Sequence, residues 1–317
     1  MDVRRFHEIV NEATARGDTA CADQLVGMAV ARAFALLRAG RYREGWVEFE
    51  KRSRAIRFGG PVWDGSPFPD QTLLIQTEQG MGDTIQFARY VTLAKARGGR
   101  VVLRAQAPLA MLLRASRLAD EVISPGDPLP EWHHRTLLMS LPALFGTTLE
   151  TLPRSNVPYL RTPYQANLGG KNPRKVGLVW AGNPENPRDA VRSIPFSALR
   201  PLLDVPGADW FSLQVGPSAE QIDDRRVDHL GSGLTDFAIT AAVVNALDLV
   251  ITVDTSVAHL AGALGRPVWV LLDHDPDWRW MLGREDSPWY PTMRLFRQDA
   301  PGDWGGVVQR IAQALRR

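Results

Sequence analysis

Apolar residues follow two different spacings along the chain, and the change of spacing separates a helical start from a longer α/β part. In the first part the apolar positions recur three or four residues apart, the spacing of one face of an α-helix: Val26, Val30, Ala33, Phe34 and Leu37. Gly40 is the clear break, and a second helix after it is expected to carry Tyr42, Trp46 and Phe49 on one face. The pattern predicts a helical hairpin within residues 1–58.

From residue 71 onward, short apolar runs alternate with helical patterns, which is typical of parallel sheets with crossover helices. In the first group, strands are expected at 72–76, 100–103, 121–124 and 136–139, with helices at 83–97 and 108–116. In the second group, strands are expected at 176–180, 210–215, 248–253, 267–272 and 293–296, with helices at 196–203, 235–247, 255–264 and 304–315.

A proline-rich stretch at 152–173 separates these two groups and is interpreted as an interdomain linker. The predicted domains are a helical segment at 1–58, a first βα domain at 59–165 and a second βα domain at 166–317. Two such domains joined by a linker leave a cleft between them, and ligands usually bind in such clefts.

Composition narrows the class of protein. The chain has 317 residues, 44% of them hydrophobic and 23% charged, with a net charge of +2. These values exclude a disordered or fibrous chain, and the charge is too small for a dedicated nucleic-acid binder. The single cysteine, Cys21, excludes an internal disulfide. We find no signal sequence and no apolar run that predicts an integral membrane segment, and we expect a cytoplasmic protein.

The strongest local motif lies at the end of the strand predicted at 248–253. Asp254, Thr255 and Ser256 are all good N-cap residues, and a helix follows them at once. A helix N-terminus offers free backbone N–H groups and a positive dipole end, so this junction predicts a phosphate site. His259 lies one turn further on the same face. The alternative is that the polar residues only cap the helix and that His259 packs in the core.

A second strand-to-helix junction contains the loop Glu78, Gly80, Met81, Gly82 and Asp83. The glycines allow a tight turn and the close approach of a ligand. A carboxylate here would repel phosphate but could accept a proton from a hydroxyl, so Asp83 is a candidate general base, and Glu78 is a second carboxylate in the same loop. The alternative is that Asp83 is only an N-cap.

A third loop, at 179–195, combines arginines, a hydroxyl and a flexible backbone, which fits a pyrophosphate clamp. Its candidate residues are Gly182, Asn183, Arg188, Arg192 and Ser193. Gln214, near the end of the next strand, is expected to face the same cleft. The alternative is a solvated surface loop.

A fourth cluster, Asp273, His274, Asp275 and Asp277, has the side chains of a hard-cation site, although acidic loops after strands often bind nothing. The aromatic residues that follow are expected to pack a domain interface, with stacking on a sugar or base as the alternative. They are Trp278, Trp280, Trp289 and Tyr290.

The pairing of Gly80-Met81-Gly82-Asp83 with the run Asp254 to Ala261 resembles glycosyltransferase family 9, the heptosyltransferase-like enzymes. The helical start resembles part of a tetratricopeptide repeat, so the chain is most similar to bacterial repeat proteins that end in such a domain. The resemblance implies a GT-B fold with two Rossmann-like domains facing a cleft. It also implies inverting, metal-independent transfer from a nucleotide-diphosphate sugar, with no cofactor.

Carried over by position, the resemblance makes Asp83 the base that deprotonates the acceptor hydroxyl. Asp254, Thr255 and Ser256 would hold the donor diphosphate, and Arg192 would supply positive charge to the leaving group. Together with the residues singled out above, the candidate donor-side positions also include Trp180, Gly182, Asn183, Ser193, Gln214 and His259.

The expected function is therefore transfer of a sugar to a protein or a surface-glycan precursor. Repeat helices usually bind peptides, so the helical start favours a protein acceptor. A binding scaffold that has lost catalysis, and a sugar-nucleotide epimerase with the same architecture, are the alternatives.

Overall fold

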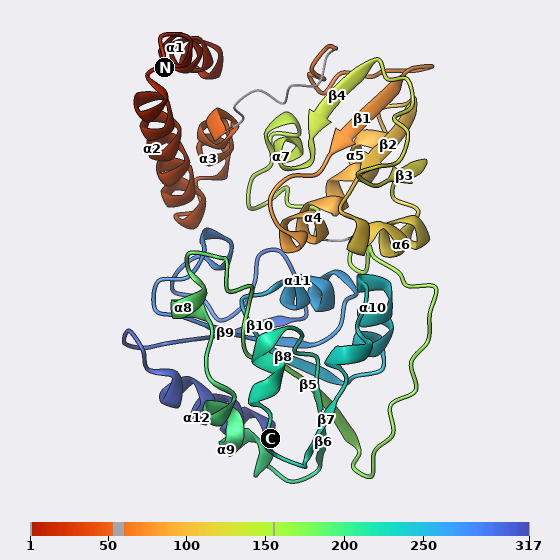
Figure 1. The fold of residues 1–317 in the computed structure, drawn as a ribbon, viewed down its shortest axis with the longest axis vertical. Helices are drawn as coiled ribbons and strands as arrows, with labels where there is room; N and C mark the ends of the chain where they lie inside the picture. The colour runs from red at the N-terminus through yellow and green to blue at the C-terminus, as the bar shows by residue number, and fades with distance from the viewer. Residues whose placement is uncertain (1, 53–59, 155, 317) are drawn as a thin grey trace.

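The computed structural model describes residues 2–52, 60–154 and 156–316, with a helical segment ahead of two parallel sheets (Figure 1). The helical segment contains α1 (Val3–Ala15), α2 (Thr19–Arg38), α3 (Tyr42–Phe49) and a 3-10 turn (Glu50–Arg52). The expected hairpin is α2 with α3. An additional break precedes it, where Gly17 adopts a φ of 81° and Asp18 caps α2 through the backbone N–H of Cys21. The domain boundary predicted at 58/59 lies outside the described residues.

Aromatic side chains dock the helical segment onto the rest of the molecule. The ring centroids of Trp46 and Trp278 lie 5.5 Å apart, and those of Tyr42 and Trp289 lie 5.9 Å apart. All four side chains are buried. The segment is therefore packed against the C-terminal part of the chain, and its likeness to a tetratricopeptide repeat stays a prediction.

The first sheet is wholly parallel, with the order β3-β2-β1-β4. Its strands are β1 (Thr72–Gln76), β2 (Arg100–Arg104), β3 (Glu121–Ile123) and β4 (His134–Leu137). Its helices are α4 (Met81–Phe87), α5 (Val91–Lys95), α6 (Ala107–Ser116) and α7 (Leu141–Leu144). The single helix expected at 83–97 is instead α4 and α5 joined by a 3-10 turn (Ala88–Tyr90).

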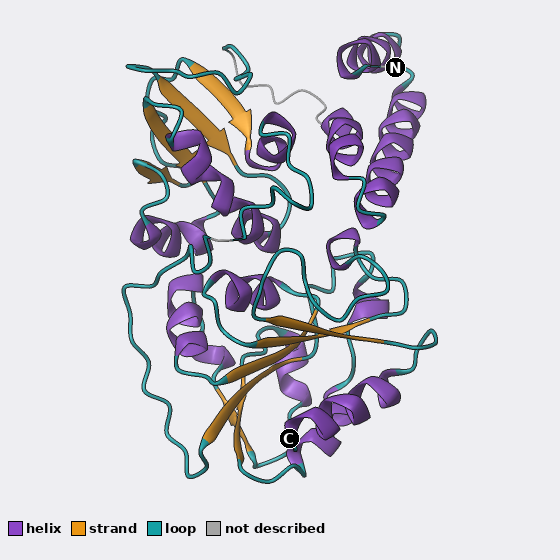
Figure 2. Cartoon of the chain, turned by 180° about the vertical axis from the view of Figure 1, so that it is seen from behind, coloured by secondary structure: helices purple, strands orange, loops and turns teal. Residues whose placement is uncertain are grey.

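The second sheet is also wholly parallel, with the order β10-β9-β8-β5-β6-β7. The strands of both sheets are the orange arrows in Figure 2. Its strands are β5 (Arg174–Val179), β6 (Ala208–Ser212), β7 (Val227–His229), β8 (Leu249–Val253), β9 (Val268–Leu272) and β10 (Met293–Arg297). Its helices are α8 (Asp189–Arg192), α9 (Arg200–Leu203), α10 (Phe237–Asn245), α11 (Ser256–Ala263) and α12 (Trp304–Leu315). The strand order reverses between β5 and β8, which is where doubly wound sheets usually bind ligands.

The two sheets are joined by direct packing as well as by the chain. Helices α4 and α11 contact each other, and a Cβ added at Gly82 would lie 3.0 Å from Cδ2 of His259. Arg89 is fully buried; it donates to the backbone oxygen of Trp289 at 2.7 Å and to the hydroxyl of Tyr159 at 3.1 Å. The α/β fold with parallel sheets is thus confirmed, whereas the boundary at 165/166 stays a prediction.

Among the described residues, α2 is the one helix that is long and apolar enough to cross a membrane. This criterion considers length and composition alone, and core helices of soluble proteins also meet it. Ala33 and Leu37 on α2 are fully buried against neighbouring elements. The helix is thus at most weak evidence for a membrane segment.

Candidate active site

The residues expected to bind phosphate lie together where β8 ends and α11 begins. Thr255 is the N-cap of α11, and its hydroxyl lies 3.0 Å from that of Thr252 rather than bonding to the helix. Arg192 reaches this end of the helix from the loop after β5, and its Nη1 donates to the backbone oxygen of Asp254 at 3.0 Å. The structure therefore brings the expected clamp arginine to the expected phosphate site.

Asp189 holds together the loop at 179–195, which was expected to form a pyrophosphate clamp and is called the clamp loop below. Its Oδ1 accepts hydrogen bonds from Nε of Arg192 at 3.2 Å and from Oγ of Ser193 at 2.9 Å. The Ser193 oxygen in turn accepts from the backbone N–H of Gly182 at 2.9 Å. A Cβ at Gly182 would lie 2.3 Å from Nη2 of Arg192, so only glycine leaves this space free. Asn183 is exposed, and its Oδ1 accepts from the backbone of Glu185.

Two residues expected on the donor side are structural instead. Gln214 is buried; its Oε1 accepts from the backbone N–H groups of Trp180 and Ala181, and its Nε2 donates to backbone oxygens. Its side chain therefore ties β5 to β6 and does not face a cleft. The Trp180 indole is also fully buried and packs 5.0 Å from the ring of Phe196, in the core of the second sheet.

Asp83 lies at the start of α4, facing the second sheet. Its Oδ2 accepts from the backbone N–H of Gly80 at 2.9 Å, so it closes a capping interaction as the alternative interpretation required. Its Oδ1 accepts from Nη2 of Arg279, on the 3-10 turn after β9. The side chain of Asp83 is 17% exposed, so the carboxylate still reaches solvent.

Arg279 connects the two sheets, and sequence reasoning missed it. In addition to Asp83, its guanidinium donates to Oε1 of Gln86 at 2.6 Å and to Oδ1 of Asp277 at 2.8 Å. It stacks over the ring of Trp278, 4.5 Å from the centroid. A buried arginine with two carboxylate partners is a strong electrostatic anchor. The sequence signal that could have identified Arg279 is its position between Trp278 and Trp280, two residues after Asp277.

Glu78 does not act beside Asp83 but holds the helical segment. Its carboxylate accepts from Nε and Nη2 of Arg52, whose side chain is 6% exposed. Arg52 also donates to Glu50 at 2.9 Å and to the hydroxyl of Ser140 at 3.3 Å. This ion pair fixes the loop that leads into α4.

His259 packs at the interface between the sheets, as the core interpretation predicted. It is 5% exposed, its Nδ1 lies 3.0 Å from the Tyr290 hydroxyl, and its ring stacks on Trp280 at 5.3 Å. Burial, followed by the charges of Arg279 and Arg89, lowers the pKa of His259 well below its usual value. The imidazole is therefore neutral at pH 7 and positions α11 against α4.

Asp254 has an unusual ionisation. Burial, followed by repulsion from the Asp277 carboxylate, raises the pKa of Asp254 to about 6, although Arg192 and Arg279 oppose the shift. A carboxyl that is protonated more readily than usual at the expected phosphate site would repel an incoming anion less.

The acidic cluster after β9 is held by arginines rather than arranged around one point. Asp273 accepts from Arg188 at 2.8 Å, Asp275 pairs with Arg38, and Asp277 pairs with Arg279. Within 2–52, 60–154 and 156–316, no group of three or more His, Cys, Asp or Glu side chains is placed to hold a metal ion. The aromatic residues of this region, Trp278, Trp280, Trp289 and Tyr290, are buried at the interface as expected.

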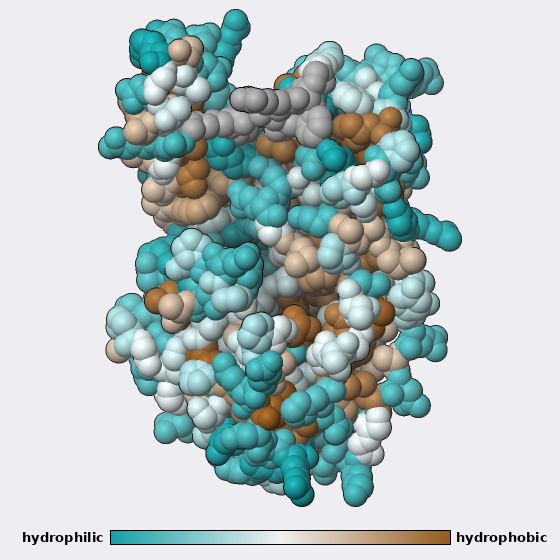
Figure 3. All heavy atoms as spheres, viewed as in Figure 1, coloured by the Kyte–Doolittle hydropathy of each residue, from teal (hydrophilic) through white to brown (hydrophobic). Residues whose placement is uncertain are grey.

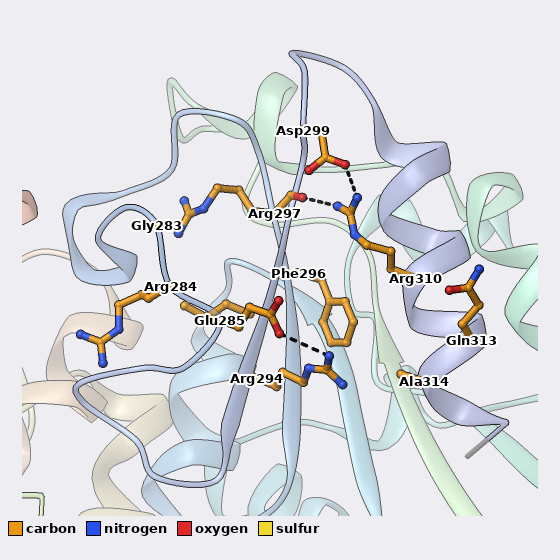
Figure 4. Close-up of a pocket in the computed structure, with 11 residues that line it drawn as sticks. Gly283, Arg284, Glu285, Arg294, Phe296, Arg297, Asp299, Arg310, Gln313 and Ala314 are labelled. Carbon is orange, nitrogen blue, oxygen red and sulfur yellow. Dashed lines mark hydrogen bonds and ion pairs between the residues drawn. The ribbon is translucent and has the colours of Figure 1, made fainter.

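A cavity of about 650 Å³ lies away from this site, between β10 and α12 (Figure 4). Arginines line it, but three of them already have carboxylate partners: Arg284 with Asp286, Arg294 with Glu285, and Arg310 with Asp299. These ion pairs offset the charges of those three arginines.

Comparisons with known proteins point to one family. Residues 223–278 match the sequence model of glycosyltransferase family 9 (heptosyltransferase). The chain is 31% identical over 335 aligned positions to Protein FlbA of Caulobacter vibrioides, an alignment that covers 93% of this chain and 56% of FlbA. The chain thus spans about half the length of that relative, and the name FlbA states no activity.

Among the similar solved structures, one aligns with a TM-score above 0.5 and shares the fold of this chain. E. coli heptosyltransferase WaaC with ADP aligns with a TM-score of 0.51 at 14% identity, covering 76% of this chain and 99% of WaaC. E. coli ADP-heptose LPS heptosyltransferase II aligns with a TM-score of 0.49 at 14% identity, covering 77% of this chain and 98% of that one. Residues 223–278 are thus similar in sequence to glycosyltransferase family 9, and the WaaC alignment shows a shared fold.

Proposed function

We propose that the protein is an inverting glycosyltransferase that moves a sugar from a nucleotide-diphosphate donor to an acceptor hydroxyl without a metal ion. The observation that carries the proposal is that the N-terminal ends of α4 and α11, which carry different functional groups, are connected by hydrogen bonds and charge. Asp83 at the start of α4 is joined through Arg279 to Asp277, whose carboxylate raises the pKa of Asp254 at the start of α11. An acidic acceptor side thus faces a phosphate-binding donor side.

On the donor side, the N-terminus of α11 would receive the diphosphate. The hydroxyls of Thr255 and Ser256 and the free N–H groups of the first turn are donors, and Arg192 lies beside them. When the bond from the sugar to the diphosphate breaks, negative charge grows on the leaving group. Fixed donors and a guanidinium at this point stabilise that charge in place of a metal ion.

On the acceptor side, Asp83 would accept the proton of the attacking hydroxyl. Both of its oxygens already accept a hydrogen bond, but each carboxylate oxygen has a second lone pair. Attack on the sugar from the side opposite the diphosphate inverts the anomeric centre. The acceptor is a protein or a surface-glycan precursor, and the helical segment favours a protein.

A catalytically inactive scaffold is the second candidate, and one observation favours it. Asp83 is held by Arg279 and by the Gly80 N–H, as a purely structural cap would be. The requirement for the Asp83 carboxylate in turnover separates the two candidates.

The first test is a thermal-shift screen of the whole chain with nucleoside diphosphates and nucleotide-sugars, with and without magnesium. A ligand that binds the folded state raises Tm by mass action. We expect a specific shift without magnesium. A shift that requires magnesium would contradict metal independence, and no shift with any nucleotide would contradict the donor site.

A further inference from the structure

A groove runs between the helical segment and the loops of the second sheet. Its volume is about 790 Å³, within the range of roughly 300–1,000 Å³ that ligand sites occupy. One wall is the C-terminal half of α2, and the other is the segment that follows β9. The views from both sides show the lower end of α2 above these loops (Figures 1 and 2).

The floor of the groove is mainly apolar. The lining side chains that lack charge include Ala31, Phe34, Ala35, Trp278, Met281 and Leu282. Leu282 is 53% exposed, and Ala31 and Ala35 are exposed along α2. Hydrophobic residues also reach the surface near the lower end of the helical segment (Figure 3). The floor offers shape and apolar contact rather than a series of hydrogen-bonding groups.

Two residues that line the groove are linked to the proposed active site. Arg188 lines the groove and lies four residues before Arg192 on the clamp loop. Asp277 also lines it and accepts from Arg279, which holds Asp83. The groove is therefore connected to the Asp83 carboxylate through the side chains of Asp277 and Arg279.

The chemistry of the lining selects among possible acceptors. A glycan needs polar partners along its length, and the floor provides few. A phosphorylated lipid needs unpaired cations, but the two arginines of the groove, Arg38 and Arg188, are already engaged by Asp275 and Asp273. The backbone of an extended peptide can keep its hydrogen bonds to water. Only its apolar side chains then need to contact the groove.

We propose that this groove binds the acceptor, and that the acceptor is a polypeptide with an apolar side chain within a few residues of the modified hydroxyl. This inference rests on the proposed function, because the groove is connected to its active site through Asp277 and Arg279. It assigns the acceptor class, which the active-site residues alone leave open.

The test measures peptide binding directly, by fluorescence anisotropy of labelled ten-residue peptides with a central serine. One panel carries leucine or phenylalanine two to four residues from the serine, and the matched panel carries glycine there. Ala31→Trp fills the groove from an exposed helix position. Ala20→Trp makes the same substitution at an exposed position of α2 that does not line the groove.

We expect the apolar panel to bind more tightly than the glycine panel, Ala31→Trp to weaken that binding at least tenfold, and Ala20→Trp to leave it unchanged. Equal binding of the two panels, or no effect of Ala31→Trp, would overturn the inference. So would saturable binding of maltohexaose, or of phosphatidylglycerol vesicles, that Ala31→Trp removes while no peptide binds. The nucleotide thermal shift is measured on the same variants, so a failure of the donor site is distinguishable from a failure of the groove.

Discussion

Arg279 donates a hydrogen bond to Asp83 although the two residues are 196 positions apart, and this contact joins the Asp83 carboxylate to the loops of the second sheet. The guanidinium is buried and also bonds Asp277 and Gln86. The proposed base is therefore positioned by the domain that would bind the donor. Such an arrangement couples the geometry of the base to the packing of the two sheets.

Asp83→Asn tests whether the carboxylate is the base. The amide oxygen can still accept from Gly80 or Arg279, but an amide cannot take up the acceptor proton. Because general-base catalysis contributes roughly 10²–10⁴-fold, we expect turnover to fall by about that factor. Nucleotide binding, measured by thermal shift, should stay unchanged. Unaltered turnover would exclude Asp83 as the base, and the purified variant's circular dichroism spectrum serves as the folding control.

Gly82→Leu tests the contact between α4 and α11. A Cβ at Gly82 already lies 3.0 Å from the buried ring of His259, so a larger side chain must displace it. We expect a loss of about 1–3 kcal/mol in the free energy of unfolding, measured in urea. Gly27→Leu is the matched control, because Gly27 is also helical but has nothing within 4 Å of its added Cβ. An equal effect at both positions would contradict tight packing at Gly82.

The sequence predicts those elements whose pattern is local. α12 is formed with the expected bounds because Asp303 caps it and one face carries buried apolar residues. β7 is missed because only one of its three residues, Val227, is buried, so no apolar run marks it. Similarly, the short α8 has no buried residue.

The candidate site likewise has features that a local sequence pattern predicts and features that depend on packing. The junction of β8 with α11 is predictable because a strand, cap residues and a helix follow each other directly, whereas phosphate binding there stays a prediction. Gln214 and Trp180 are misassigned because their position after a strand does not reveal whether a side chain faces a cleft or the core. The contact of Arg279 with Asp83 depends on how the two sheets pack, which no local pattern encodes.

The Arg52–Glu78 ion pair should couple the helical segment to the first sheet. The two side chains are 6% and 19% exposed, so Arg52→Met leaves a poorly solvated carboxylate, and we expect a loss of about 2–4 kcal/mol in the free energy of unfolding. In a double-mutant cycle with Glu78→Gln, the coupling energy should be about 1–3 kcal/mol. Urea unfolding of the four proteins gives this value. Additive effects would show that the pair contributes nothing beyond its separate contacts.

Asp254 should make stability depend on pH. Its folded-state pKa is about 6, because of burial and then Asp277, whereas an unfolded aspartate titrates at about 3.9. The folded state binds the proton more tightly, so this contribution is fully present below about pH 4 and is lost as pH rises to 6. Asp254→Asn stays neutral throughout. We therefore expect the Tm of the unmodified protein to fall relative to that of Asp254→Asn between pH 4.5 and 7. The opposite contribution of His259, whose lowered pKa favours the folded state above pH 6.5, is common to both proteins and cancels in this difference. A difference in Tm that does not change with pH would show that Asp254 titrates normally.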